Sequence, residues 1–198
     1  MTKKPDVLSR CQRIYAHPLY KKHFQNLQKF EEDRIFCRHT FEHFMDVARI
    51  AYIMNLEKGL GLSKEIIYAA ALLHDIGRDE QYENDIPHEI AGAKIAESLL
   101  PECGFDDREK SMIVGAILEH RSGNKHGGDC SKTEGESVIN ESCGNDSSER
   151  CFKAVNDDIK TLSNIIFTAD KASRQCFSCI AQNECNWSMD KRNLEISI

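Results

Sequence analysis

The stretch Ala69–Arg78, with the sequence Ala-Ala-Ala-Leu-Leu-His-Asp-Ile-Gly-Arg, constrains the fold more than any other part of the chain. Its apolar run predicts a buried helix, and the glycine that follows predicts the end of that helix. His74 and Asp75 therefore stand at the end of a core element, where an ionised carboxylate beside an imidazole is costly unless something pairs with both. A bound metal cation would pair with both groups.

Apolar residues recur at helical spacing along most of the chain, and no segment alternates with the period of two that is typical of strands. We therefore predict an all-α fold, a bundle of about six to eight helices. Proline, glycine and capping residues set the predicted boundaries. The predicted helices are two pieces within 5–36 separated at Pro18, followed by 40–57, 64–75, 87–100, 107–120 and 157–173.

A polar segment separates the last two predicted helices. Its composition changes to Gly, Ser, Asn, Asp and Lys, which predicts a flexible insertion over 122–157 before the last core helix. The 198 residues are enough for one full core with one insertion, so we expect a single domain over 1–198. Within it, 38–121 and 158–173 form the predicted core, and 174–198 form a cysteine-rich tail.

The overall charge and hydropathy exclude some classes of partner. A net charge of −6 argues against a broad electrostatic surface for duplex nucleic acid. No stretch approaches the roughly 18 consecutive apolar residues of a membrane span, and the start of the chain lacks the apolar run of a secretory signal. We therefore expect a cytoplasmic protein without a membrane partner, whose nine cysteines are reduced thiols rather than a disulfide framework.

Several predicted helices carry a histidine or aspartate in line with an apolar stripe. Neighbours on one helix face are three, four and seven residues apart, so each polar residue can be assigned to its stripe. A single histidine on an apolar face is more often an ordinary core residue than a ligand, but five such placements are hard to explain by packing alone. The five residues are His43, His74, His88, His120 and Asp170, and Asp75 is an adjacent sixth group.

Neutral imidazoles and carboxylates together are the ligands that zinc, iron and manganese take in proteins. Four histidines and two aspartates exceed the needs of one tetrahedral site and suit two metals bridged by a carboxylate. Asp75 is suited to bridging because a carboxylate has two oxygens, whereas an imidazole offers a metal one nitrogen.

The order of these residues resembles the signature of the HD-domain metal-dependent phosphohydrolase superfamily: His43, then His74-Asp75 followed by Ile-Gly, then Asp170. His88 ahead of Ala-Gly-Ala and His120 ahead of Arg-Ser-Gly are similar to a two-metal subset, which includes the bacterial HD-type diadenosine tetraphosphate hydrolases. The resemblance covers 38–121 and 158–173 and implies an HD-domain helical bundle.

The resemblance also implies roles for these residues. His43, His74, Asp75 and Asp170 would hold one metal, while His88 and His120 would hold the second with Asp75 bridging. Iron and manganese are the expected metals, and His74 and Asp75 the expected catalytic residues. The implied reaction is hydrolysis of a phosphoester or phosphoanhydride by a metal-bridging hydroxide. The implied substrate is a small phosphorylated metabolite, with a nucleotide or dinucleoside polyphosphate as the expected class.

Arg78, Arg121 and Lys171 follow these positions closely and are candidates to contact a substrate phosphate, although each is equally well explained as solvated surface charge. Two other functions stay open. One is a nucleotide-sensing protein that binds metal without turnover, which a turnover assay would separate from a hydrolase. The other is a di-iron oxygenase, which the cationic neighbours disfavour.

The tail carries three cysteines in a Cys-x2-Cys-x5-Cys arrangement, Cys176, Cys179 and Cys185. Such cysteines can be small buried apolar residues. They can equally be three of the four ligands of a structural zinc site or an iron–sulfur cluster. The candidates for a fourth ligand are Cys37, Cys103 and Cys151.

Four further histidines fit none of the apolar stripes. His39 lies four residues before His43, so it is either an outer partner of the metal ligands or a residue at the start of a helix, and we favour the second. His17 and His23 carry no assigned role, and His126 in the polar insertion is expected to be exposed.

Overall fold

The structure, a computed structural model, describes residues 7–120 and 147–196, together with the side chains of all of these except 147–153. These residues contain helices and no strand, so the all-α prediction is confirmed. The helices are α1 (Ser9–Ala16), α2 (Pro18–Phe30), α3 (Phe41–Glu57), α4 (Lys64–Leu73), α5 (Arg78–Asn84), α6 (His88–Leu99), α7 (Asp107–Glu119) and α8 (Ser147–Ala172), with short 3-10 turns η1 (Cys176–Ser178) and η2 (Met189–Lys191) in the tail.

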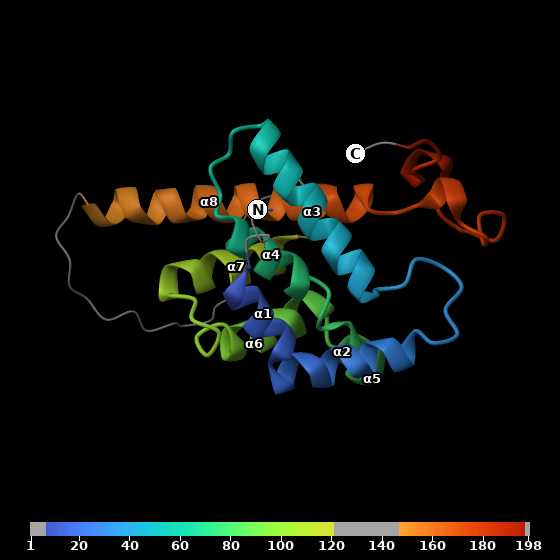
Figure 1. The fold of residues 1–198 in the computed structure, drawn as a ribbon, viewed down its shortest axis with the longest axis horizontal. Helices are drawn as coiled ribbons and strands as arrows, with labels where there is room; N and C mark the ends of the chain where they lie inside the picture. The colour runs from blue at the N-terminus through green and yellow to red at the C-terminus, as the bar shows by residue number, and fades with distance from the viewer. Residues whose placement is uncertain (1–6, 121–146, 197–198) are drawn as a thin grey trace, which may run out of the picture.

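Helix α4 lies at the centre of the bundle and packs against α1, α3, α7 and α8. Its sequence is apolar nearly all round, and seven of its ten residues are buried, which is what a central helix requires. Figure 1 shows α8 as the longest helix, with α3 crossing it and the tail continuing from its C-terminal end. The carboxyl end of α4 therefore leads into the interior of the bundle.

The helices begin where the capping residues predict. Thr40 caps α3, with its hydroxyl accepting from the backbone N–H of His43 at 3.4 Å. Pro18 occupies the first turn of α2. Asp106 caps α7 in a capping box with Glu109, in which each side chain accepts from the other residue's backbone N–H. The predicted boundaries at these three helices are therefore confirmed.

Asp106→Ala should destabilise the protein by about 1 kcal/mol, because α7 would lose a side-chain acceptor for one of its first N–H groups. The free energy of unfolding from a urea titration measures this loss. Asp107→Ala is the matched control, since Asp107 is the neighbouring exposed residue and pairs only with Lys110 among the described side chains. An equal loss in both variants would show that the cap is not the cause.

Two elements differ from their prediction. Helix α5 was not predicted, because its sequence Arg-Asp-Glu-Gln-Tyr-Glu-Asn is polar and has no apolar stripe. Helix α8 begins at Ser147 rather than near residue 157, so the predicted insertion 122–157 overlaps its first turns. No proline or glycine interrupts α8, and Val155 and Ile159 pack against the core. The rest of the predicted insertion, 121–146, lies outside the described residues.

The turn that follows α4 packs directly against the backbone of α6. Gly77 is in this turn, and a Cβ atom built on it would lie 2.4 Å from both the backbone nitrogen of Gly92 and the carbonyl oxygen of His88. Only glycine allows so close an approach of two backbones. The contact holds His74 and Asp75 beside the first turn of α6.

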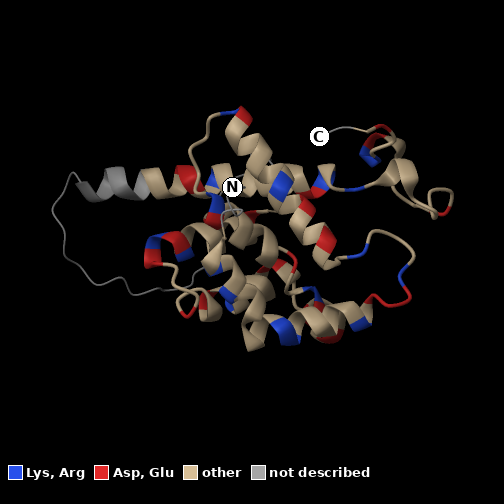
Figure 2. Ribbon diagram, viewed as in Figure 1, with Lys and Arg blue, Asp and Glu red and all other residues tan. Residues whose placement is uncertain are grey.

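Lys and Arg positions alternate with Asp and Glu positions along the described helices, as Figure 2 shows. This distribution is in keeping with the net charge of −6. Within 7–120 and 147–196, no helix combines the length and the apolar character that crossing a lipid bilayer requires.

Candidate metal centre

The structure brings together all six residues that the sequence predicts as metal ligands. They form two groups, and in each group the donor atoms lie within 4.8 Å of one another. Asp75 belongs to both groups. The first group is His43, His74, Asp75 and Asp170, and the second is Asp75, His88 and His120.

These residues meet because each lies near an end of a helix, at one end of the bundle. His43 lies in the first turn of α3 and His88 begins α6. Asp170 lies in the last turn of α8. His74 and His120 follow α4 and α7 directly as their C-terminal caps, and Asp75 lies in the turn after His74. The polar donors thus lie at or next to the ends of helices whose apolar faces form the core.

Three of the histidines are oriented by a hydrogen bond from Nδ1 to a carbonyl oxygen. The pairs are His74 with Ala71 at 2.7 Å, His120 with Ile117 at 2.5 Å, and His88 with the side chain of Gln81 at 2.9 Å. A carbonyl oxygen can only accept, so Nδ1 carries a proton, and in the neutral form of each ring Nε2 presents a lone pair to the site. Metal-binding histidines are commonly held in this way.

The lone pairs face one another across a short distance. Nε2 of His88 lies 3.3 Å from Nε2 of His120, and these two atoms lie 3.1 and 3.8 Å from Oδ1 of Asp75. Two nitrogens this close require either a proton on one of them or a cation between them. Nε2 of His43 and Nε2 of His74 are buried and make no hydrogen bond of standard geometry. This donor set fits a divalent metal such as zinc, iron or manganese.

The electrostatics keep the carboxylates ionised and two of the imidazoles neutral. Burial lowers the pKa of His43 and of His120 to about 4, and the charge of His74 lowers both further. Burial opposes ionisation of Asp75, but His74 and Arg78 hold its pKa well below the usual range. Burial also opposes ionisation of Asp170, yet His74 lowers its pKa. Neutral imidazoles and ionised carboxylates are the forms that bind a metal.

Two of the three predicted phosphate contacts lie at this site. Nε of Arg78 is 2.9 Å from Oδ1 of Asp75, and Nζ of Lys171 is 2.5 Å from Oδ2 of Asp170. Both side chains also line the cavity that opens onto the donor groups. Arg121 lies outside the described residues.

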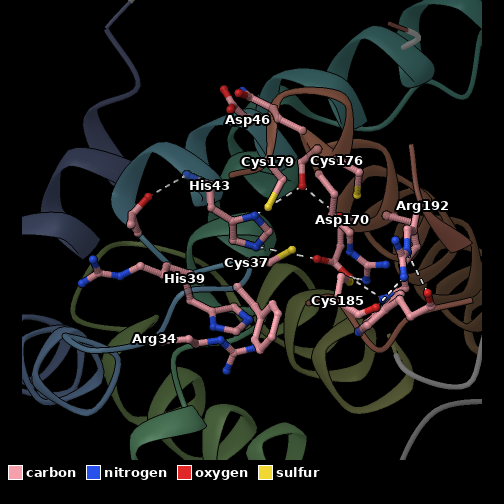
Figure 3. A pocket seen from close by; sticks show the side chains of 18 of the residues that line it. Arg34, Cys37, His39, His43, Asp46, Asp170, Cys176, Cys179, Cys185 and Arg192 are labelled. Atoms are coloured by element: carbon pink, nitrogen blue, oxygen red, sulfur yellow. Dashed lines mark hydrogen bonds and ion pairs between the residues drawn. The ribbon is translucent and has the colours of Figure 1, made fainter. Parts of the chain in front are cut away.

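The cavity has a volume of about 750 Å³ and reaches from the donor groups to the tail. Further cations line it that the sequence did not single out, from the α2–α3 connection and from the tail (Figure 3). They are Arg34, Arg38, Arg174, Lys191 and Arg192. Cationic walls around a pair of candidate metal sites favour an anionic ligand.

A family model described as HD domain matches residues 40–175, which is more than half of the chain. The chain belongs to the HD-domain family. HD domains bind divalent metals, and the two donor groups lie within the matched range. Membership in this family supports a metal-dependent phosphohydrolase as the general class of activity.

The chain is also similar to individual proteins. An uncharacterized protein of Clostridium beijerinckii is 38% identical over 169 residues, which cover 85% of this chain and 86% of that protein. Ribonuclease Y of Clostridium tetani is 29% identical over 105 residues, or 53% of this chain but only 18% of the ribonuclease. The crystal structure of a predicted HD superfamily hydrolase from an uncultured Thermotogales bacterium matches with a TM-score of 0.53 and 18% identity, covering 88% of this chain and 79% of the other. This structure shows a common fold.

The two donor groups together are called the HD site below. His39 contacts this site directly, so the favoured prediction that it merely starts a helix was wrong. It is buried just before α3, and its Nε2 lies 3.3 Å from Oδ2 of Asp75. On its other side Glu31 accepts from the backbone N–H of His39 at 2.7 Å and lies 2.6 Å from its Nδ1. The four-residue spacing to His43 was the signal in the sequence, but His39 lies outside any apolar stripe.

Glu31→Gln should weaken metal binding at the HD site about 10- to 100-fold, because it loosens the histidine that positions Asp75. Burial opposes ionisation of Glu31, yet its bonds to His39 lower its pKa to about 2, so the carboxylate is charged at neutral pH. Competition with a metal-binding dye measures the affinity. Glu32→Gln is the matched control, since Glu32 is adjacent and exposed. Equal affinities in the two variants would contradict a positioning role for Glu31.

The remaining histidines lie away from the HD site or outside the described residues. His23 pairs with Asp79 at 2.8 Å, and with Glu80 they form a third group of metal-type donors between α2 and α5. The His23–Asp79 contact joins these two helices. His17 caps α2 by accepting from the N–H of Leu19. His126 lies outside the described residues.

Proposed function

We propose that this HD-domain protein is a two-metal phosphohydrolase that cleaves a phosphoester or phosphoanhydride bond of a small phosphorylated metabolite. The observation that carries the proposal is the sharing of Asp75 between two compact donor groups, with the Nε2 atoms of His88 and His120 facing each other at 3.3 Å. Two cations held by these donors, with Asp75 serving both groups, would account for both features.

In this proposal His43, His74, Asp75 and Asp170 hold one metal, and Asp75, His88 and His120 hold the other. Bound metals, with iron or manganese expected, supply an activated water and neutralise charge on the phosphoryl oxygens. The protein contributes positioning. Carbonyl acceptors fix the imidazole rings, and His39 fixes Asp75 from the side opposite Arg78.

The cavity favours a nucleotide or a dinucleoside polyphosphate as substrate. A volume of about 750 Å³ lies within the range of small-molecule sites. Arginine and lysine side chains line it and suit several phosphate groups. Phe36 and Trp187 line the same cavity and offer aromatic faces on which a base can stack. The relative named ribonuclease Y supports a substrate that contains nucleotides.

The proposal includes a cytoplasmic location and excludes duplex nucleic acid and membranes as partners. Its support is the net charge of −6, the mixed surface charge and the free thiols of the described cysteines.

Purified protein loaded with manganese or iron should release phosphate or a shorter nucleotide from at least one member of a substrate panel. The panel contains nucleoside mono-, di- and triphosphates, dinucleoside polyphosphates and simple phosphoesters, and chromatography identifies the products. Binding of nucleotides without any product would instead support a nucleotide sensor. Metal-dependent oxygen consumption without phosphate release would support a di-iron oxygenase. Either outcome would overturn the proposed hydrolysis.

A further inference from the structure

Four cysteines from two distant segments line the outer part of the cavity. Cys176, Cys179 and Cys185 come from the tail, and Cys37 comes from the connection between α2 and α3 (Figure 3). All four are free thiols. Partial desolvation of the Cys37 thiol raises its pKa although the residue as a whole is exposed, and the thiols of Cys176 and Cys179 are close enough to raise it further. The cavity thus gathers all three predicted tail ligands and one of the candidates for a fourth.

The other candidates do not share this position. Cys103 is buried in the hydrophobic core, and its carbonyl oxygen accepts from Arg13 of α1. The side chain of Cys151 is not among those described. Of the cysteines whose side chains the structure describes, Cys37 is the one that lines the cavity together with the tail.

The tail after α8 adopts a defined conformation although it has no hydrophobic core of its own. In the described part beyond α8, Ala181 is the one buried apolar residue, whereas Ile180 is 97% exposed and Met189 is 64% exposed. Trp187 does not anchor the tail in the core either, because it is 41% exposed and stacks on the guanidinium of Arg174. Small units that lack a core are commonly held by a disulfide or a metal.

Polar contacts arrange the tail around its cysteines. Cys176 and Cys179 are joined by the η1 turn, and the carbonyl of Cys176 accepts from the side chain of Gln182 at 3.0 Å. Arg192 donates to the carbonyl oxygens of Gln182, Cys185 and Trp187. These bonds fix the backbone on both sides of the three thiols.

We propose that Cys37, Cys176, Cys179 and Cys185 bind one soft metal centre, an iron–sulfur cluster or a zinc ion, which fastens the tail to the α2–α3 connection beside the HD site. Each thiol loses a proton on binding, since the thiolate is the ligand. Arg174 and Arg192 line the same part of the cavity and offset the negative charge of four thiolates. This site does not depend on the proposed hydrolase function.

The spacing of the sulfur atoms favours an iron–sulfur cluster over a single zinc ion. A tetrahedral zinc ion with Zn–S bonds of about 2.3 Å requires sulfurs about 3.8 Å apart. Among the described cysteines, no three sulfur atoms lie within 4.8 Å of one another. An iron–sulfur cluster holds its four thiolates farther apart than a single ion does, so less movement is needed to bind it.

The test is metal and sulfide analysis of the whole chain purified without oxygen. The expected result is about four iron atoms per chain beyond any iron held by the HD site, and four acid-labile sulfides, with visible absorbance, as for a [4Fe–4S] cluster. Zinc bound by the same cysteines would support the same site, occupied by one zinc ion in place of the cluster. A wild-type protein with neither labile sulfide nor cysteine-dependent zinc would overturn the proposal.

Variants assign the bound metal to these cysteines. Cys37→Ser and Cys179→Ser should each remove it, while Cys103→Ser should retain it. Cys37 is exposed and lies between helices, so the bundle should still fold, which circular dichroism and the metal content of the HD site verify. Asp75→Ala should keep the cysteine-bound metal. Loss of metal from the HD site can therefore be distinguished from loss of metal from the cysteines. Full retention in Cys37→Ser would contradict the assignment of Cys37.

Discussion

Asp75→Ala should remove both metals from the HD site and lower the rate of phosphate ester hydrolysis on the order of a thousandfold or more. Asp75 is the one residue shared by the two donor groups, and its Oδ1 lies within 3.8 Å of the Nε2 atoms of His88 and His120. The loss of several kcal/mol of charge stabilisation in the transition state accounts for the size of the effect. Elemental analysis and kcat measure the two losses.

His88→Ala should differ from Asp75→Ala by removing one metal rather than two, because His88 belongs to the second group alone. The wild-type ratio should approach two metals per chain in this site, after subtraction of any metal that Cys37→Ser removes. Asp158→Asn is a control, since Asp158 lies on the surface in a pair with Arg108. A wild-type ratio near one would contradict the two-metal assignment.

Gly77→Ala should destabilise the protein by about 1–3 kcal/mol or more and weaken metal binding at the second group. The new Cβ would lie 2.4 Å from backbone atoms of both Gly92 and His88, and backbone atoms cannot move aside as a flexible side chain can. Relief of the clash requires α6 to move, and His88 moves with it. The free energy of unfolding and the metal affinity should fall together.

Gly92→Ala is the matched control for this contact. A Cβ on Gly92 meets its nearest atom, the carbonyl oxygen of Leu73, at 3.4 Å, which is an ordinary van der Waals distance. Because alanine favours a helix interior over glycine by about 1 kcal/mol, stability should be unchanged or higher. A comparable loss in both variants would show that the approach of the two backbones is not what Gly77 provides.

The sequence was sufficient to predict most of the helices and the meeting of six donors, because both follow from local sequence patterns. His74, His120 and Asp170 each close an apolar stripe, and a stripe at the spacing of a helix face must point into the core. Asp106 marked the start of its helix through capping chemistry that acts over three residues. When such a donor lies at the end of a buried apolar stripe, it must lie close to the other donors wherever the ends of those helices come together.

Other parts of the site cannot be predicted from local sequence patterns. His39 reaches Asp75 from a connection between helices, where periodicity carries no information. Helix α5 is stabilised by tertiary contacts with α2 and α6 rather than by an apolar stripe of its own. The tail lines the cavity through Arg174 and Arg192, and the approach of Cys37 to the tail depends on the folding of everything between them.

The two donor groups are carried by different helices apart from the turn that they share. His43 and Asp170 come from α3 and α8, whereas His88 begins α6 and His120 ends α7. Substitutions in α6 and α7 can therefore alter the second ion without touching the ligands that come from α3 and α8. The centre is modular in this sense. A descendant could lose or alter its second donor group, and with it the second ion of the proposed centre, while the first donor group and the core stayed intact.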